Sequence, residues 1–147
     1  MRTYLLLIVA LMAAGCEGDS GPTTPTGRTT SFFVTSTTSV TGNLGGLAGA
    51  DAMCLRLATA AGHDGSNWRA YLSVERDPAN GNQATHARDR IGTGPWYNAN
   101  RLLIANNLTE LHSRTGDAEL FVNEHGLRIN GQWSGSPSPN EHDMLTG

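Results

Sequence analysis

Lysine is absent from this chain of 147 residues, and its ten basic side chains are all arginines that form no basic run. Charged residues are only 16% of the chain, and the formal net charge is −3, so loss of Arg2 with an export signal would leave about −4. Nucleic acids and heparin-like polyanions are bound by concentrated basic patches. We therefore expect no nucleic-acid partner.

Cysteine and metal-binding motifs are equally scarce. The chain holds two cysteines, Cys16 and Cys54, and five dispersed histidines without a His-Glu-x-x-His spacing. The length suits one domain with a modest core, preceded by an export signal. These patterns predict no cofactor.

Residues 1–15 have the pattern of a lipoprotein signal peptide. Arg2 precedes a short apolar run at residues 5–12, which is too short to span a bilayer comfortably. Small residues stand directly before Cys16, as in the bacterial lipobox, where the cysteine is lipidated and the chain is cut before it. An ordinary secretory signal ending beside a cysteine is the alternative. We expect a lipidated Cys16 that holds the protein in the membrane.

The residue after Cys16 favours an outer location. Glu17 is not the aspartate that retains enterobacterial lipoproteins in the inner membrane. We therefore expect the protein in the bacterial cell envelope, at the outer membrane or the cell surface. Residues 16–30 comprise the lipidated cysteine and a flexible tether rich in Gly, Pro and Thr, because this stretch has no large apolar residue to bury.

One amphipathic helix is predicted within residues 43–62. Apolar residues recur there at steps of three and four, which places them on one helical face; they are Leu47, Ala50, Cys54, Leu57 and Ala61. Asp51 is expected near the positive end of the helix dipole, and Gly62 at a left-handed C-terminal cap.

The remaining pattern predicts short extended segments and turns. Strands are expected at 32–37, 68–73, 102–105, 120–122 and 126–131, a turn at 77–82, and a short second helix at 84–91.

Three sequence blocks carry a resemblance to a known family. They are Phe-Val-Thr-Ser-Thr-Thr at 33–38, Gly-Asn-Leu-Gly-Gly-Leu-Ala-Gly-Ala-Asp-Ala at 42–52 with Cys54, and Trp-Arg-Ala-Tyr-Leu-Ser at 68–73; Gln-Trp-Ser-Gly-Ser at 132–136 adds a looser match. From residue 31 to the end, the chain resembles an uncharacterised domain family of bacterial surface lipoproteins, distantly similar to endostatin. The resemblance implies an α+β, C-type-lectin-like domain at 31–147, with one main helix and a short second one against a twisted, mostly antiparallel sheet with long loops.

The same resemblance implies a missing partner for Cys54. In related domains the matching helix cysteine pairs with a cysteine near the C-terminus, and the chain continues into closing strands. We therefore expect the domain to be truncated at its C-terminus. The zinc ligands and heparin-binding arginines of endostatin find no matching residues.

The segment after residue 137 invites comparison with the calcium loop of some C-type lectins. Ser138 replaces the glutamate of that loop, which leaves Asn140, Glu141 and Asp143 as weak calcium candidates. A polar turn is the favoured alternative.

Candidate ligand contacts are few. Trp96 and Tyr97, beside Pro95 in a glycine-rich loop, are the candidates for an exposed aromatic contact with a glycan or protein. Core packing is the favoured alternative for Trp96, as it is for Trp68 and Trp133.

Catalytic signals are weaker still. Cys54 lies on the apolar helix face and is not expected to be a nucleophile. His63–Asp64 and His142–Asp143 are expected to be solvated pairs, and no two carboxylates stand out for glycoside hydrolysis.

The expected function is that of a lipid-anchored, surface-exposed, non-catalytic binding or adhesion module, partnered by the membrane and an extracellular glycan or protein. That expectation follows from analogy of fold. The alternatives are a structural envelope lipoprotein with no external ligand and, less favoured, a hydrolase with an unrecognised site.

Overall fold

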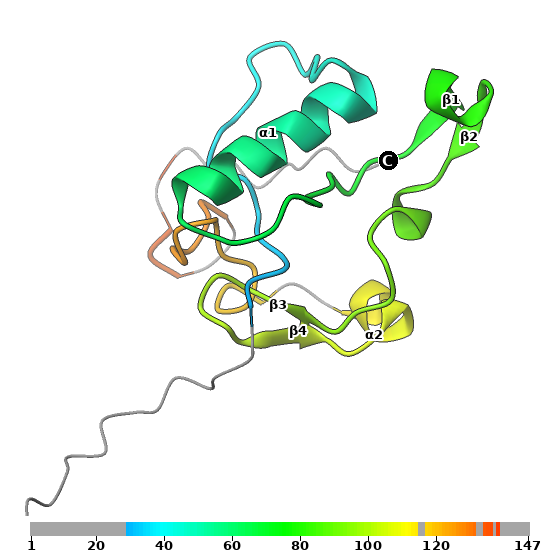
Figure 1. The fold of residues 1–147 in the computed structure, drawn as a ribbon. Coiled ribbons are helices and arrows are strands. Elements are labelled where there is room, and N and C mark those ends of the chain that lie inside the picture. The colour runs from blue at the N-terminus through cyan, green and yellow to red at the C-terminus, as the bar shows by residue number, and fades with distance from the viewer. Residues whose placement is uncertain (1–28, 115–116, 132–133, 137, 139–147) are drawn as a thin grey trace, which may run out of the picture.

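The computed structural model describes residues 29–114, 117–131, 134–136 and 138. Its elements are, in chain order, α1 (Gly46–Ala60), β1 (Val74–Asp77), the 3₁₀ turn η1 (Pro78–Asn80), β2 (Gln83–Thr85), the 3₁₀ turn η2 (Ala87–Asp89), β3 (Trp96–Tyr97), β4 (Leu103–Ala105) and α2 (Leu108–Ser113). Strands β1 and β2 form one antiparallel pair and β3 and β4 another. Over these described residues the fold is therefore α+β, with two helices and two small sheets (Figure 1).

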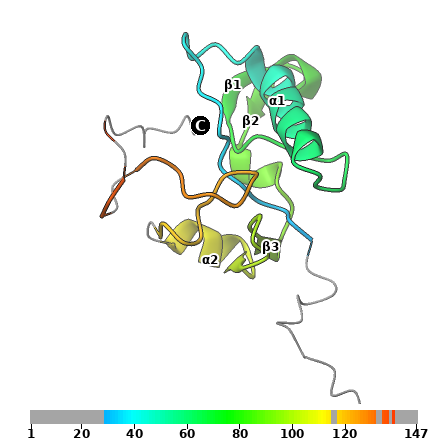
Figure 2. The ribbon, with the colours of Figure 1, turned by 90° about the vertical axis from the view of Figure 1, so that its left-hand side faces the viewer.

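Irregular segments, rather than helices or strands, occupy the middle of the molecule. In Figures 1 and 2, α1 lies on one side, β3 and α2 lie on the other, and the N-terminal segment runs between them. Within the described ranges, every helix is too short or too polar to traverse a lipid bilayer.

Helix α1 confirms the predicted helix and its C-terminal cap. Gly62 has a φ of 77°, which a residue without Cβ adopts at little cost. Its N–H donates to Thr59 O at 3.1 Å, and the N–H of His63 donates to Ala58 O at 2.9 Å. These two bonds make the Schellman motif that satisfies the last helical carbonyls.

The apolar face of α1 also follows the predicted stripe. Ala50 is buried, Leu47, Cys54, Leu57 and Ala61 are half-buried, and Ala58 adds a fully buried position. Asp51 lies in the second turn rather than the first, and the first turn of α1 carries no acidic residue. The expected interaction of Asp51 with the helix dipole is therefore wrong, and its carboxylate has other partners, described below.

The predicted turn at 77–82 is confirmed as the connection between β1 and β2. Asp77 caps η1, because its Oδ1 accepts the N–H of Ala79 at 2.9 Å. Its Oδ2 accepts the hydroxyl of Thr85 at 2.8 Å, which ties the last residue of β1 to the last residue of β2. The helical turn expected at 84–91 is present as the shorter η2.

The small core lies around β3 and β4. Trp96, Ile104 and Ala105 are buried at its centre. Partly buried apolar side chains surround them: Phe32, Ile91, Leu108, Leu111 and Phe121. Full burial of a side chain such as Ile104 contributes about 1.5–3 kcal/mol.

A buried amide shapes the loop between β3 and β4. Oδ1 of Asn98 accepts the N–H groups of Asn100 and Leu102 at 3.0 and 2.9 Å. Its Nδ2 donates to Leu120 O at 2.9 Å. Because the side chain of Asn98 is fully buried and its oxygen and nitrogen are both bonded, it ties the later segment at 117–123 to this hairpin at little desolvation cost.

Several predicted strands are corrected by the structure. Residues 32–37 pair only through one parallel bridge, between Val34 and Asn123, and residues 120–131 contain one antiparallel bridge, between Val122 and Arg128. No ladder forms at 68–73. Strand-like side chains are not enough here, because a ladder also needs a neighbouring backbone in register.

The position of the second α-helix is also corrected, because residues 84–91 form only the 3₁₀ turn η2. Helix α2 lies at 108–113, after the predicted strand at 102–105, which is confirmed in shorter form as β4. Asn107 caps α2 by accepting the N–H of Glu110 at 3.0 Å, and Glu110 accepts the N–H of Asn106 at 2.8 Å. This reciprocal arrangement is close to a capping box.

Candidate functional site

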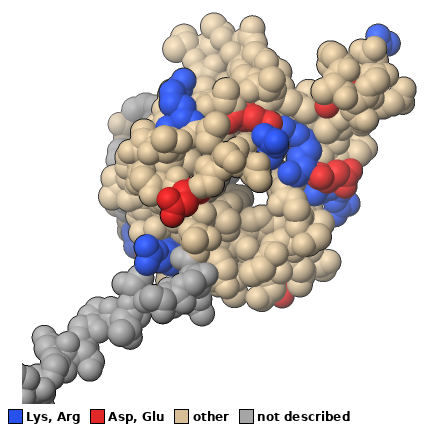
Figure 3. All heavy atoms as spheres, viewed as in Figure 1, with Lys and Arg blue, Asp and Glu red and all other residues tan. Residues whose placement is uncertain are grey.

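The described residues enclose a central cavity of about 690 Å³. One wall is the N-terminal segment 31–39, another is the inner face of α1, and a third is segment 67–72; parts of 90–96, 111–112 and 121–130 complete it. Figure 3 shows the hollow in the middle of one face, with both arginine and acidic side-chain atoms around it. Its volume is in the range of about 300–1,000 Å³ typical of ligand pockets.

Aromatic rings form much of the apolar wall. Phe33 packs on Trp68 with ring centroids 4.9 Å apart, and His63 lies 6.4 and 6.2 Å from these two rings. Phe32 meets Phe121 edge-on at 5.9 Å. Stacked and edge-on rings of this kind add about 0.5–1.5 kcal/mol per pair beyond their buried area.

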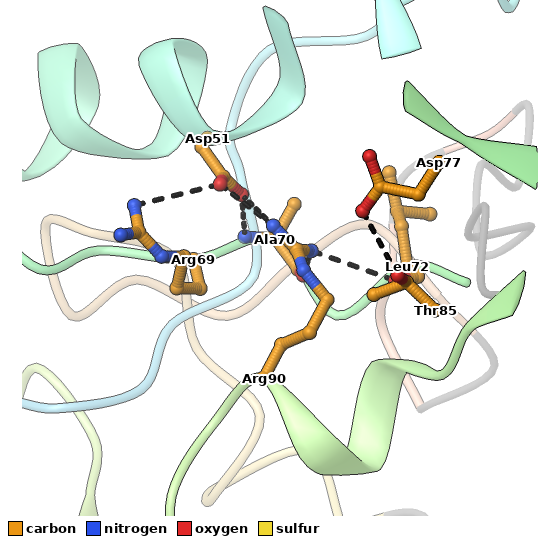
Figure 4. A network of polar contacts seen from close by, with 7 residues as sticks. All are labelled: Asp51, Arg69, Ala70, Leu72, Asp77, Thr85 and Arg90. Carbon is orange, nitrogen blue, oxygen red and sulfur yellow. Dashed lines mark hydrogen bonds and ion pairs between the residues drawn. The ribbon is translucent and has the colours of Figure 1, made fainter. Parts of the chain in front are cut away.

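A charged network joins α1 to the wall segment 67–72 (Figure 4). Nη2 of Arg90 lies 2.8 and 2.6 Å from the two carboxylate oxygens of Asp51. Arg90 also donates to the carbonyl of Ala70 at 2.7 Å, and Asp51 accepts the N–H of Ala70 at 2.9 Å. Charge-assisted bonds are about twice as strong as neutral ones.

Arg69 adds a second cation to this network. Its Nη1 lies 3.5 Å from Asp51, and its side chain is 46% exposed, against 11% for Arg90. Two guanidinium groups thus share one carboxylate, and the network keeps a net positive charge. Because Arg69 is the more exposed of the two arginines, most of this excess positive charge lies near solvent.

A chain of three polar side chains lies at the rim. Nε2 of His112 is 2.6 Å from the Tyr71 hydroxyl, and Nη2 of Arg88 is 3.2 Å from Nδ1 of His112. A guanidinium has only donors, so Nδ1 accepts and the neutral ring carries its proton on Nε2. His112 then donates to the Tyr71 oxygen, which leaves the hydroxyl proton of Tyr71 to point elsewhere.

Glu124 holds the N-terminal wall in place. Its carboxylate accepts the N–H of Ser36 at 2.9 Å and also the Ser36 hydroxyl, while its side chain is 1% exposed. His63 contacts the backbone carbonyl of Glu124, and the ring of His125 lies 3.7 Å from the carboxylate. Burial is the largest single influence and raises the pKa of Glu124. The bonds from Ser36, a bond from the Glu124 backbone and the nearby His125 all lower it, and together they leave the pKa below its ordinary value.

The predicted aromatic contacts are only partly accessible. Trp96 is 5% exposed and belongs to the core, so the expectation of an exposed contact is wrong and the packing alternative is confirmed. Tyr97 is half-buried, and its backbone bonds to Ser31 and Phe32. Trp96 is part of the cavity wall. The backbone of Tyr97 holds the start of the N-terminal segment 31–39 through these bonds.

Cys54 is a free, half-buried thiol beside the cavity. Burial raises its pKa, and the negative charge of Asp51 raises it further. A thiol held in its protonated form is a poor nucleophile. Whether Cys54 takes part in any reaction stays a prediction.

Several predicted sites lie outside the described residues: Cys16, Trp133, Asn140, Glu141, His142 and Asp143. Among the residues that are described, no group of three or more His, Cys, Asp and Glu side chains is arranged to hold a metal ion.

Comparison with protein-family models, with curated proteins and with solved structures finds no significant match to this chain. The site is therefore interpreted from its own geometry.

The polar groups around the cavity were not found from the sequence. Asp51 and Arg90 are 39 positions apart, and Tyr71 and His112 are 41 positions apart, so neither pair has a local signature. Asp51, Arg69 and Tyr71 do lie in blocks that were singled out for their pattern, but nothing in those blocks indicated that the three side chains meet around one cavity.

Proposed function

We propose that this chain is a lipid-anchored, surface-exposed, non-catalytic binding or adhesion module of a bacterial envelope. The observation that carries the binding part is the central cavity, which joins an aromatic wall to polar groups at its rim. The anchor and the outer location rest on the lipobox and tether of residues 1–30.

The α+β fold can be assigned more narrowly as part of this proposal. We propose a C-type-lectin-like domain, for which the support is the order of an N-terminal extended segment, a main helix and a long loop-rich region closed on that first segment. Glycans or proteins outside the cell are the ligand classes that this architecture favours, by analogy of fold.

The absence of catalysis is supported by the character of the cavity wall. Glycoside hydrolysis needs two carboxyl groups placed across a bond. The described residues that line the cavity include neither Asp nor Glu, and the lining thiol is half-buried and protonated. A structural lipoprotein without an external ligand remains the alternative, and a hydrolase is the less favoured one.

The anchor and its location are tested on whole cells of a bacterium with an outer membrane. The full chain is expressed with radiolabelled palmitate, beside Cys16→Ala and beside Cys54→Ala as the matched cysteine control. We expect label and membrane retention in the wild type and in Cys54→Ala only. External protease should degrade the wild-type domain on intact cells, whereas protection until the outer membrane is opened would favour the structural alternative.

A further inference from the structure

The cavity has an apolar interior, and the charged side chains among its described lining residues are arginines. Three arginines line it, namely Arg69, Arg90 and Arg128, together with His112, and the described lining residues include no carboxylate. Asp51 and Glu119 bind these arginines from outside the lining. An anion entering the cavity would therefore meet no like charge among the described residues that line it.

Arg69 is the cation best placed to bind such an anion. Arg90 has both oxygens of Asp51 and two backbone carbonyls as partners, whereas the 3.5 Å contact between Arg69 and Asp51 is long and largely solvated. Exposed ion pairs of this kind contribute little and are easily rearranged. The guanidinium of Arg69 can thus turn to a ligand while Arg90 keeps Asp51 paired.

Tyr71 supplies a neutral donor on the same wall segment. Arg88 donates to His112 and His112 donates to the Tyr71 oxygen, so the hydroxyl proton of Tyr71 is directed away from His112. Tyr71 and His112 both line the cavity. Each donor in this chain polarises the next, which strengthens the final hydrogen bond to an acceptor.

We propose that the cavity binds a small amphipathic anion: an apolar, ring-bearing body packed on Phe33 and Trp68, with one carboxylate, phosphate or sulfate group held by Arg69 and Tyr71. This inference rests on the proposed binding function and names its ligand class. The charge of the wall distinguishes the ligand from an uncharged apolar molecule, and the aromatic interior distinguishes it from a free inorganic anion.

The test compares two dyes that differ in charge. Anilinonaphthalene sulfonate carries a sulfonate, and N-phenyl-naphthylamine has the same rings without it. Both are titrated at neutral pH into the purified full chain that carries Cys16→Ala, which cannot be lipidated, and are followed by fluorescence. We expect saturable binding of both dyes at one site per chain, with tighter binding of the sulfonate.

Matched variants separate charge from shape. Arg69→Gln should weaken the sulfonate about three- to fivefold, as expected for one partly exposed ion pair, without changing the neutral dye. Tyr71→Phe should weaken the sulfonate less, also without affecting the neutral dye. Arg56→Gln is the control, because Arg56 is an exposed arginine of α1 that does not line the cavity. Ala50→Leu, which adds volume at a buried lining position, should weaken both dyes.

Three results would overturn the proposal. These are equal binding of the two dyes unaffected by Arg69→Gln, no binding of either dye, and binding at many sites in samples that have lost near-ultraviolet circular dichroism. The last check, applied to each variant, separates an unfolded chain from a lost site. Lipidation and surface exposure do not enter this assay, so its failure is distinguishable from failure of the anchoring proposal.

Discussion

Arg90 binds both carboxylate oxygens of Asp51, at 2.8 and 2.6 Å, and so connects the end of η2 to the second turn of α1. The two side chains are only 11% and 16% exposed. A pair this far from water is costly to break, because removing one partner leaves the other charge unpaired and poorly solvated.

Loss of this pair should destabilise the fold. We expect Asp51→Asn to lower the free energy of unfolding by about 2–3 kcal/mol, since Arg90 would then lack a countercharge. Urea denaturation followed by tryptophan fluorescence measures the change. Arg69→Gln is the matched control and should cost less than about 1 kcal/mol, because its ion pair is long and exposed. Equal losses in the two variants would contradict this assignment.

The start of α1 provides a second prediction. A Cβ at Gly49 would lie 2.0 Å from the carbonyl oxygen of Leu44. Alanine is normally favoured over glycine inside a helix by about 1 kcal/mol. We expect Gly49→Ala to do the opposite and to destabilise the domain by about 1–3 kcal/mol, because backbone must move to admit the methyl group.

Thermal unfolding by circular dichroism measures this effect. The control is Ala52→Gly, at an exposed position in the middle of α1, which should cost about 1 kcal/mol through propensity alone. A stabilising Gly49→Ala variant would show that the chain around Leu44 lies elsewhere.

What was predictable from the sequence is what is decided locally. The stripe from Leu47 to Ala61 and the cap at Gly62 depend on neighbours within one helical turn, and α1 forms where they predicted it. The turn that begins at Asp77 likewise depends on its own side chain bonding to nearby backbone.

What was missed depends on distant partners. Val34 has one bridge, to Asn123, and this pairing is set by how segments 89 residues apart meet. The sheet expected for the C-type-lectin-like fold appears as two separate pairs for the same reason. Helix α2 did have a local signal, the Asn107-to-Glu110 spacing, but the apolar run before it was the more prominent pattern.

The buried carboxylate of Glu124 predicts acid sensitivity. Its pKa is lower in the folded chain than in the unfolded chain, so deprotonated Glu124 stabilises the fold at neutral pH. That contribution is fully present above the ordinary glutamate pKa of about 4.3. It is lost as the pH falls through the lower pKa that Glu124 has in the folded chain. The N-terminal wall held by Ser36 should loosen first.

Hydrogen exchange of segment 31–39 between pH 7 and pH 3 measures this loosening. Glu124→Gln should exchange faster than wild type at pH 7 and show a smaller change with pH. Glu75→Gln, at an exposed position of β1, should behave as wild type. The same exchange profile in wild type and Glu124→Gln would exclude the carboxylate as the group responsible.

Cys54 should react slowly with thiol reagents in the native state. Burial and the nearby Asp51 raise its pKa, so the reactive thiolate is rare at pH 7. With Cys16→Ala as the background, we expect labelling by a dithiobenzoate reagent to be at least tenfold slower than in urea and to accelerate as the pH rises. Asp51→Asn removes one of the two causes and should speed native labelling, provided that urea denaturation shows it still folded. Rapid labelling of the folded protein at pH 7 would place the thiol on an open surface and would contradict its position beside the cavity.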